Sequence, residues 1–206
     1  MRIPGPDPDR LLVVGGGIVV GFGVLSHELG IAGHLARQVS SATGRGVNVD
    51  ILAEADLRVD EVSSRTRDSN LPAYDAILLF LGVTDAIRRT PPRAWQTALT
   101  ALLEDVGNRT AAGTRILVVG IQPVRLVTTL DNRVGFFAET HARSLDRESI
   151  RVCAQSRQTT FVPFNPRREI SERYRTSATY GRWAAEVSPA VVAALQQNHP
   201  FGDFTI

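Results

Sequence analysis

Short apolar runs rich in β-branched residues alternate along the chain with longer segments in which apolar residues recur at helical spacing. This alternation predicts an α/β fold in which a parallel sheet is covered by helices on both faces. We therefore expect a three-layer α/β/α sandwich with a five-stranded parallel sheet. The predicted strands are Leu11–Val14, Val47–Leu52, Ala76–Leu81, Ile116–Gly120 and Thr160–Val162.

Four segments of helical periodicity lie between and after these runs. In His27–Thr43 the apolar residues share one face, Ser26 is a candidate N-cap, and Gly44 is a candidate C-cap. Proline suits a first helical turn, so Pro91-Pro92 is expected to open the next helix. The last two helices are predicted around Gly135–Arg157 and Ser177–Gln196.

The length of 206 residues fits one domain with a substantial core. We expect a flexible N-terminal lead over residues 1–9, a single domain over 10–198 and a C-terminal tail over 199–206. The longest uncharged run, Leu11–Leu25, is too short for a bilayer span and is interrupted by glycine. No membrane association is therefore expected.

Charge and cysteine content narrow the function classes further. A net charge of +2 and an aromatic fraction of 6% do not suit a nucleic-acid-binding surface. The single cysteine, Cys153, agrees with a reducing compartment, and residues 1–9 lack a signal-peptide apolar core. No histidine pair or carboxylate cluster has metal-ligand spacing. We expect a cytoplasmic protein with no metal, no cofactor and no nucleic-acid partner.

Ligands of doubly wound sheets bind beyond the carboxyl ends of the strands. The functional residues are therefore expected in the loops that follow the predicted strands. These loops are Gly15–Gly23, Ala53–Arg58, Gly82–Arg93, Gln122–Arg133 and Pro163–Thr176.

Three segments of the chain carry motif-like contexts. The first strand runs into Gly15-Gly16-Gly17-Ile18, and the third is followed by Gly82-Val83-Thr84-Asp85. Thr179-Tyr180-Gly181-Arg182-Trp183-Ala184 follows the last of these loops, near the C-terminus. In these contexts the chain resembles the SGNH (GDSL-type) hydrolases over most of its length. The resemblance implies a flavodoxin-like sandwich with a five-stranded parallel sheet and an esterase-type active site.

The resemblance also implies that the catalytic residues are replaced. Gly17 stands where the family keeps its serine nucleophile, and Thr84 stands where an asparagine completes the oxyanion hole. The family's second-motif glycine has no counterpart near Asp56. Alignment on the C-terminal motif places Ser171 at the acid and Tyr174 at the histidine. Because a Ser-His-Asp mechanism needs all three groups, the sequence predicts a catalytically degenerate member.

Such a domain is expected to bind a small ligand or a protein partner. Arginines are frequent in the loops after strands three to five, and convergent guanidinium groups would favour an anion. Solvated or paired arginines are the plainer alternative. The candidate ligand-binding residues are Gly15, Gly16, Gly17, Asp56, Gly82, Thr84, Arg88 and Arg175.

Two other functions stay open. A divergent hydrolase of esters or acetyl esters would need relocated catalytic residues, for which the candidates are His27 with Asp85 and Tyr174 with Thr84. Asp85 could instead cap the turn after the third strand. A nucleotide-binding protein could use the glycine loop Gly15–Gly17, but Val20 occupies the last glycine position of the dinucleotide motif.

Overall fold

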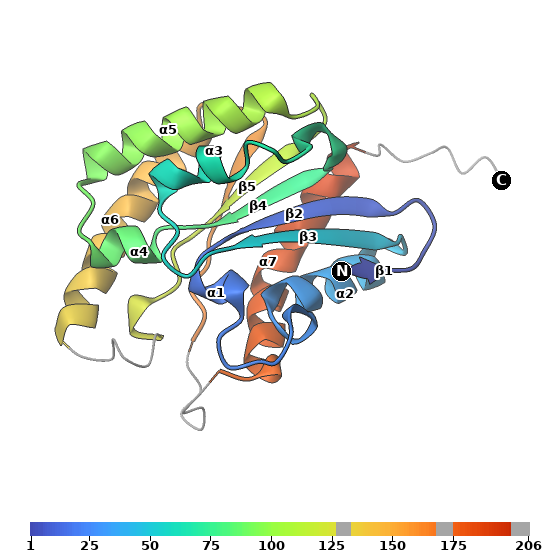
Figure 1. Cartoon of the computed structure of the whole chain (residues 1–206), viewed down its shortest axis with the longest axis horizontal. Helices are drawn as coiled ribbons and strands as arrows, with labels where there is room; N and C mark the ends of the chain where they lie inside the picture. The colour runs from blue at the N-terminus through green and yellow to red at the C-terminus, as the bar shows by residue number, and fades with distance from the viewer. Residues whose placement is uncertain (127–132, 168–174, 199–206) are drawn as a thin grey trace.

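The middle layer of the molecule is a twisted sheet flanked by helices (Figure 1). The computed structural model describes residues 1–126, 133–167 and 175–198. Within them the sheet has six strands in the order β1-β3-β2-β4-β5-β6. The strands are β1 (Arg2–Ile3), β2 (Asp9–Gly15), β3 (Val47–Ala53), β4 (Ala76–Phe80), β5 (Arg115–Val119) and β6 (Thr159–Val162).

Five of these strands are parallel, in the flavodoxin-like arrangement that the sequence predicts. Their bounds agree with the predicted ranges to within two residues. The sixth strand, β1, was not expected, because a two-residue strand just before Pro4 has no measurable periodicity. It pairs antiparallel with β3, placing Arg2 opposite Asn48.

The N-terminal segment, expected to be a flexible lead over residues 1–9, contains β1 and the first residue of β2. The Met1 ammonium donates to the Val49 carbonyl at 2.7 Å, and Asp9 already belongs to β2. The Asp9 carboxylate is fully buried and accepts two hydrogen bonds from the Arg45 guanidinium, at 2.9 and 3.0 Å. This pair joins the start of β2 to the turn before β3.

Helices cover both faces of the sheet (Figure 1). On one face α2 and α7 pack against each other, and on the other α5 packs on α6. The α-helices are α1 (Gly17–Val20), α2 (Ile31–Thr43), α3 (Val62–Arg65), α4 (Val83–Ile87), α5 (Pro92–Arg109), α6 (Arg133–Cys153) and α7 (Ser177–Asn198). Short 3₁₀ turns are η1 (His27–Leu29), η2 (Val59–Glu61), η3 (Leu71–Ala73) and η4 (Val124–Leu126).

The helix expected from His27 to Thr43 begins later than predicted. Residues 27–29 form η1, and α2 starts at Ile31 after an extended Gly30. Ser26 is the N-cap residue of η1 and not of α2, and its side chain makes no capping hydrogen bond. Gly44 ends α2 in the left-handed conformation at φ 70°, and its N–H donates to Ser40, as predicted.

Alternate strand residues divide the core into two layers. Leu11 and Val13 of β2 face α2 and α7, whereas Leu12 and Val14 face α5 and α6. This two-sided burial is why the central strands are apolar throughout. None of the described helices combines the length and the apolar stretch that crossing a membrane requires.

A carboxylate joins α6 to the end of β5. Asp146 Oδ1 accepts the Ile121 backbone N–H at 3.0 Å. Burial raises the pKa of Asp146 to about 6. The charged form is thus held in a site that solvates it poorly.

This raised pKa predicts how stability depends on pH. The native state binds more protons than the unfolded chain between about pH 4 and pH 6, so this carboxyl's contribution to stability falls as pH rises through that window. Asp146→Asn retains an acceptor for Ile121 and removes the charge. It should raise the free energy of unfolding at pH 8 by about 1–2 kcal/mol.

This gain in the free energy of unfolding should shrink as the pH is lowered toward 4. Urea unfolding at a series of pH values measures it. Asp60→Asn, an exposed carboxylate on η2, is the matched control and should change little. A variant destabilised equally at every pH would contradict the prediction.

Candidate functional site

The topological switch point of the sheet lies between β2 and β4, because the chain leaves β2 toward β3 on one side and returns to β4 on the other. Gly15, the last residue of β2, is paired with Phe80, the last residue of β4. The segments after these two strands, residues 15–23 and 81–90, therefore start side by side. We call them, with residues 53–58 after β3, the switch-point site.

The first position of the switch-point site has little room for a side chain. A Cβ at Gly15 would lie 2.5 Å from the Phe80 carbonyl oxygen, so only glycine fits there. At Gly17 a Cβ would lie 3.2 Å from Cε2 of the Phe22 ring, closer than ordinary van der Waals contact. The Phe22 ring thus lies directly beside Gly17, the residue that the sequence resemblance aligns with a serine nucleophile. The Tyr180 hydroxyl holds the Phe22 backbone by donating to its carbonyl at 2.9 Å.

The loop after β3 lies against the glycine turn, with a backbone carbonyl oxygen beside Gly16. The Glu54 N–H is donated to the Gly15 carbonyl at 3.1 Å, and the Leu57 N–H to the Glu54 carbonyl at 3.2 Å. The Ala55 carbonyl oxygen lies 3.4 Å from where a Cβ on Gly16 would stand. Asp56 is exposed. Carbonyl oxygens and a carboxylate cannot stabilise a developing oxyanion.

The turn after β4 is built around Gly82, which has φ +99°. A Cβ there would lie 2.5 Å from Ile121, so both conformation and space require glycine. Thr84 follows on α4, half-buried, and its carbonyl accepts the Arg88 N–H at 2.9 Å. The turn at Gly82 therefore leads Thr84 into α4, next to the switch point, where the sequence predicts it.

Asp85 is fully buried and serves the structure of this turn. Its Oδ2 accepts the Val59 N–H at 3.2 Å, and its Oδ1 accepts the Thr90 hydroxyl at 2.9 Å. The Arg58 Nε lies 3.6 Å from Oδ1. Burial raises the pKa of Asp85, opposed by the hydrogen bonds from Thr90 and Val59 and by the charge of Arg58.

These partners differ from the expected ones. Asp85 was a candidate to pair with His27, but His27 lies exposed in η1 while both Asp85 oxygens contact other groups. The capping alternative agrees better with the structure, because Asp85 holds the segments before α3 and α5 against α4.

The C-terminal part of the site is described from Arg175 onward. Tyr174 and Ser171, the expected histidine and acid positions, lie outside the described residues. The Arg175 guanidinium lies 5.1 Å from the centre of the Trp183 ring, and its Nη2 donates to the Leu126 carbonyl at 3.5 Å. The Arg175 carbonyl oxygen is 2.5 Å from where a Cβ on Gly23 would stand. This segment therefore packs on the loop after β2.

The loop arginines differ in their exposure to solvent. Arg175 is half-buried against Trp183, whereas Arg88 and Arg89 are exposed at the end of α4. Arg89 adopts φ +57°, an uncommon conformation for a residue with a side chain. The structure thus leaves Arg88 and Arg89 accessible beside the switch-point site.

Sequence reasoning missed a serine–histidine contact. His34 Nε2 and Ser177 Oγ lie 2.9 Å apart, joining α2 to the first residue of α7. Burial and the charge of Arg37 lower the pKa of His34. A separation of 143 residues gives no local signal for such a pair.

Comparisons with known proteins find relatives by structure alone. No protein-family profile matches the sequence, and no curated protein matches it. The lipase/acylhydrolase from Enterococcus faecalis superposes with a TM-score of 0.67 at 12% identity, covering 90% of this chain and 96% of that one.

Two further structures give the same result. The aryl esterase of M. smegmatis has a TM-score of 0.65 at 14% identity, with 90% and 99% of the two chains covered. A protein described as a G-D-S-L family lipolytic protein, from Desulfitobacterium hafniense, has a TM-score of 0.63 at 14% identity, with 87% and 98% covered. The chain thus has the fold of the SGNH hydrolases.

The contacts of Asp85 predict a large cost for its removal. Asp85→Ala would leave the Val59 N–H and the Thr90 hydroxyl without their acceptor, and should lower the free energy of unfolding by about 2–4 kcal/mol. Asp85→Asn keeps one acceptor oxygen and should cost less than half as much. Urea unfolding at pH 7 measures both. Equal losses in the two variants would show that the carboxylate charge, and not its acceptor geometry, supports the turn.

Proposed function

We propose that this chain is a non-catalytic protein of the SGNH-hydrolase fold whose switch-point site binds a small anionic molecule. The observation that carries the proposal is the contact between Gly17 and the Phe22 ring at the nucleophile position. Acyl transfer by this fold requires an attacking side chain at that strand end. Here the position has no side chain, and an aromatic ring lies against it.

The surroundings support the loss of acyl transfer. The loop after β3 places the Ala55 and Glu54 carbonyl oxygens beside Gly16, and carbonyl oxygens would oppose the negative charge of a tetrahedral intermediate. Asp85, the nearest buried acid on the β4 side, is occupied by Val59, Thr90 and Arg58. Neither an oxyanion hole nor a base is supplied by these two segments.

Arg88 and Arg89 support an anionic ligand. Both lie exposed on the turn that follows α4, within the switch-point site. Guanidinium groups form paired hydrogen bonds with carboxylate and phosphate groups. We propose such a small molecule, and not a nucleic acid or a membrane, as the partner, in the cytoplasm, where the chain's single, buried cysteine would stay reduced.

A second function is favoured by one observation. The hydrogen bond between His34 and Ser177 has the geometry of a nucleophile with its base. A divergent hydrolase acting on simple esters would use this pair. On its other edge, the imidazole Nδ1 faces Gly181: a Cβ on that glycine would lie 3.1 Å from it. Because glycine has no side chain, this residue offers no acid that could orient the ring. The pair is therefore the weaker candidate.

The nucleotide-binding alternative finds less support. The glycine loop leads into α1, which has only four residues and ends at Gly21. Dinucleotide sites use a long helix directly after the glycine loop.

Esterase assays test the main proposal. We expect no turnover of p-nitrophenyl acetate or butyrate above the buffer rate. Ser177→Ala is the matched control: if wild type has activity and this variant loses it at least about a hundredfold, the His34–Ser177 hydrolase is correct and the non-catalytic proposal is wrong. Active-site labelling by a fluorophosphonate, followed by mass spectrometry, identifies the serine.

Anion binding tests the second part of the proposal. We expect inorganic phosphate or succinate to bind at millimolar concentration in calorimetry, and Arg88→Gln to weaken binding at least about fivefold. Arg151, an exposed arginine near the C-terminal end of α6, provides the charge-matched control. The Arg151→Gln variant should bind these anions as the wild type does. Equal weakening in both variants would show a general charge effect and contradict a specific site.

A further inference from the structure

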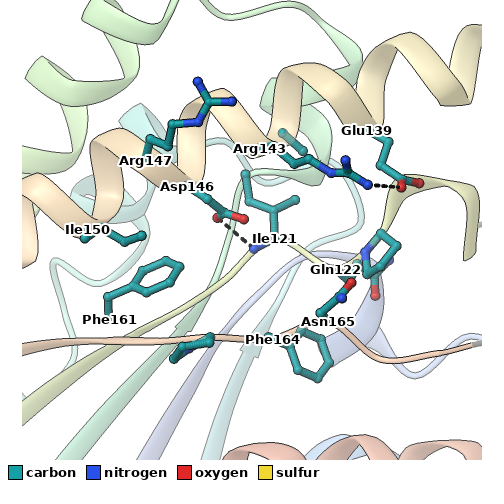
Figure 2. Close-up of a pocket in the computed structure, with 13 residues that line it drawn as sticks. Ile121, Gln122, Glu139, Arg143, Asp146, Arg147, Ile150, Phe161, Phe164 and Asn165 are labelled. Carbon is teal, nitrogen blue, oxygen red and sulfur yellow. Dashed lines mark hydrogen bonds and ion pairs between the residues drawn. The ribbon is translucent and has the colours of Figure 1, made fainter.

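A cavity of about 370 Å³ lies between α6 and the carboxyl ends of β5 and β6 (Figure 2). Its lining contains no residue of the switch-point site. The α6 side provides Glu139, Arg143 and Asp146, and the strand side provides Gln122 and Phe161. Its volume lies within the range of small-molecule sites.

Two acceptor groups line this cavity: the Asp146 carboxylate is half-buried, and Gln122 is buried. Asp146 points from α6 toward the strand ends, where Oδ1 contacts the Ile121 N–H at 3.0 Å (Figure 2). Among the described residues, its other oxygen accepts no hydrogen bond. The Gln122 side chain is only 4% exposed, and its Oε1 has no hydrogen-bond partner within the described part of the chain. Native proteins rarely leave buried acceptors without a donor, so a molecule that donates is expected here.

The remaining lining has an apolar wall and a balanced charge. Ile121, Phe161 and Phe164 provide the wall, and Ile150 extends it as an exposed apolar side chain. The two arginines of the lining, Arg143 and Arg147, balance the two carboxylates, Glu139 and Asp146. A ligand without net charge fits such a lining best.

Arg143 is half of an exposed ion pair, and Arg147 stands one turn further along α6. The Arg143 Nη2 lies 3.2 Å from Glu139 Oε1, which leaves other guanidinium N–H groups for a ligand. Arg147 has no ion-pair partner within the described residues. The α6 rim can therefore hold a carboxylate while Asp146 holds a cation.

We propose that this cavity binds a free α-amino acid with an apolar side chain. The ligand ammonium donates to Asp146 and Gln122, the ligand carboxylate accepts from Arg143 or Arg147, and the side chain packs on Phe161 and Ile150. A primary ammonium supplies three donors, enough for the Asp146 carboxylate and the Gln122 carbonyl oxygen. The site is independent of the proposed anion site at the end of β2.

Calorimetry with three related probes tests the chemistry. L-Phenylalanine should bind at millimolar or lower concentration. Phenethylamine, which lacks the carboxylate, should bind at least about fivefold more weakly, and 3-phenylpropionate, which lacks the ammonium, should not bind measurably. Equal binding of phenylalanine and 3-phenylpropionate, or no binding of phenylalanine at all, would overturn the proposal.

Variants place the binding in this cavity. Asp146→Asn, which keeps the acceptor for Ile121, should weaken phenylalanine binding at least about tenfold. Arg67→Gln, an exposed arginine that belongs to neither site, should leave phenylalanine binding unchanged. The probes differ from those of the anion test, so a failure here is distinct from a failure of the proposed function. In ¹H–¹⁵N NMR spectra, the Ile121 amide signal should shift on titration with phenylalanine. Binding that survives Asp146→Asn, or that leaves the Ile121 signal in place, would contradict this assignment.

Discussion

The buried carboxylate of Asp85 is the constraint on which the switch-point site depends. One side chain accepts hydrogen bonds from Val59 before α3 and from Thr90 before α5, and it lies 3.6 Å from the Arg58 guanidinium. Three segments that are separate in sequence are thereby fixed around the turn after β4. Because a lone buried carboxylate is costly, these donors must stay in place together. The position of Thr84 and of the exposed arginines follows from this arrangement.

The fold could be predicted from the sequence because its central strands are apolar on both faces. The five parallel strands and the stop of α2 at Gly44 are encoded locally, by unbroken apolar runs and by a glycine in the left-handed conformation. The start of α2 was misplaced because η1 and Gly30 interrupt the pattern without breaking its periodicity. The two-residue β1 depends on its pairing with β3, which no local signal reveals.

The site was predictable only in part. The positions of Gly17 and Thr84 followed from their places after strands, and the structure puts both at the switch point. The contact of Phe22 with Gly17, the contact of His34 with Ser177 and the burial of Asp146 against Ile121 are tertiary. Each depends on side-chain direction after folding. For the same reason the pairing of His27 with Asp85, plausible in sequence, is absent from the structure.

The close approach of Gly23 to Arg175 has a mechanical consequence. The segment after β2 and the segment before α7 touch through backbone atoms, and the Tyr180 hydroxyl adds a second tie at Phe22. A displacement of residues 22–23 would therefore have to break the Tyr180–Phe22 hydrogen bond or carry Arg175 along with it, which couples the end of the loop after β2 to the start of α7.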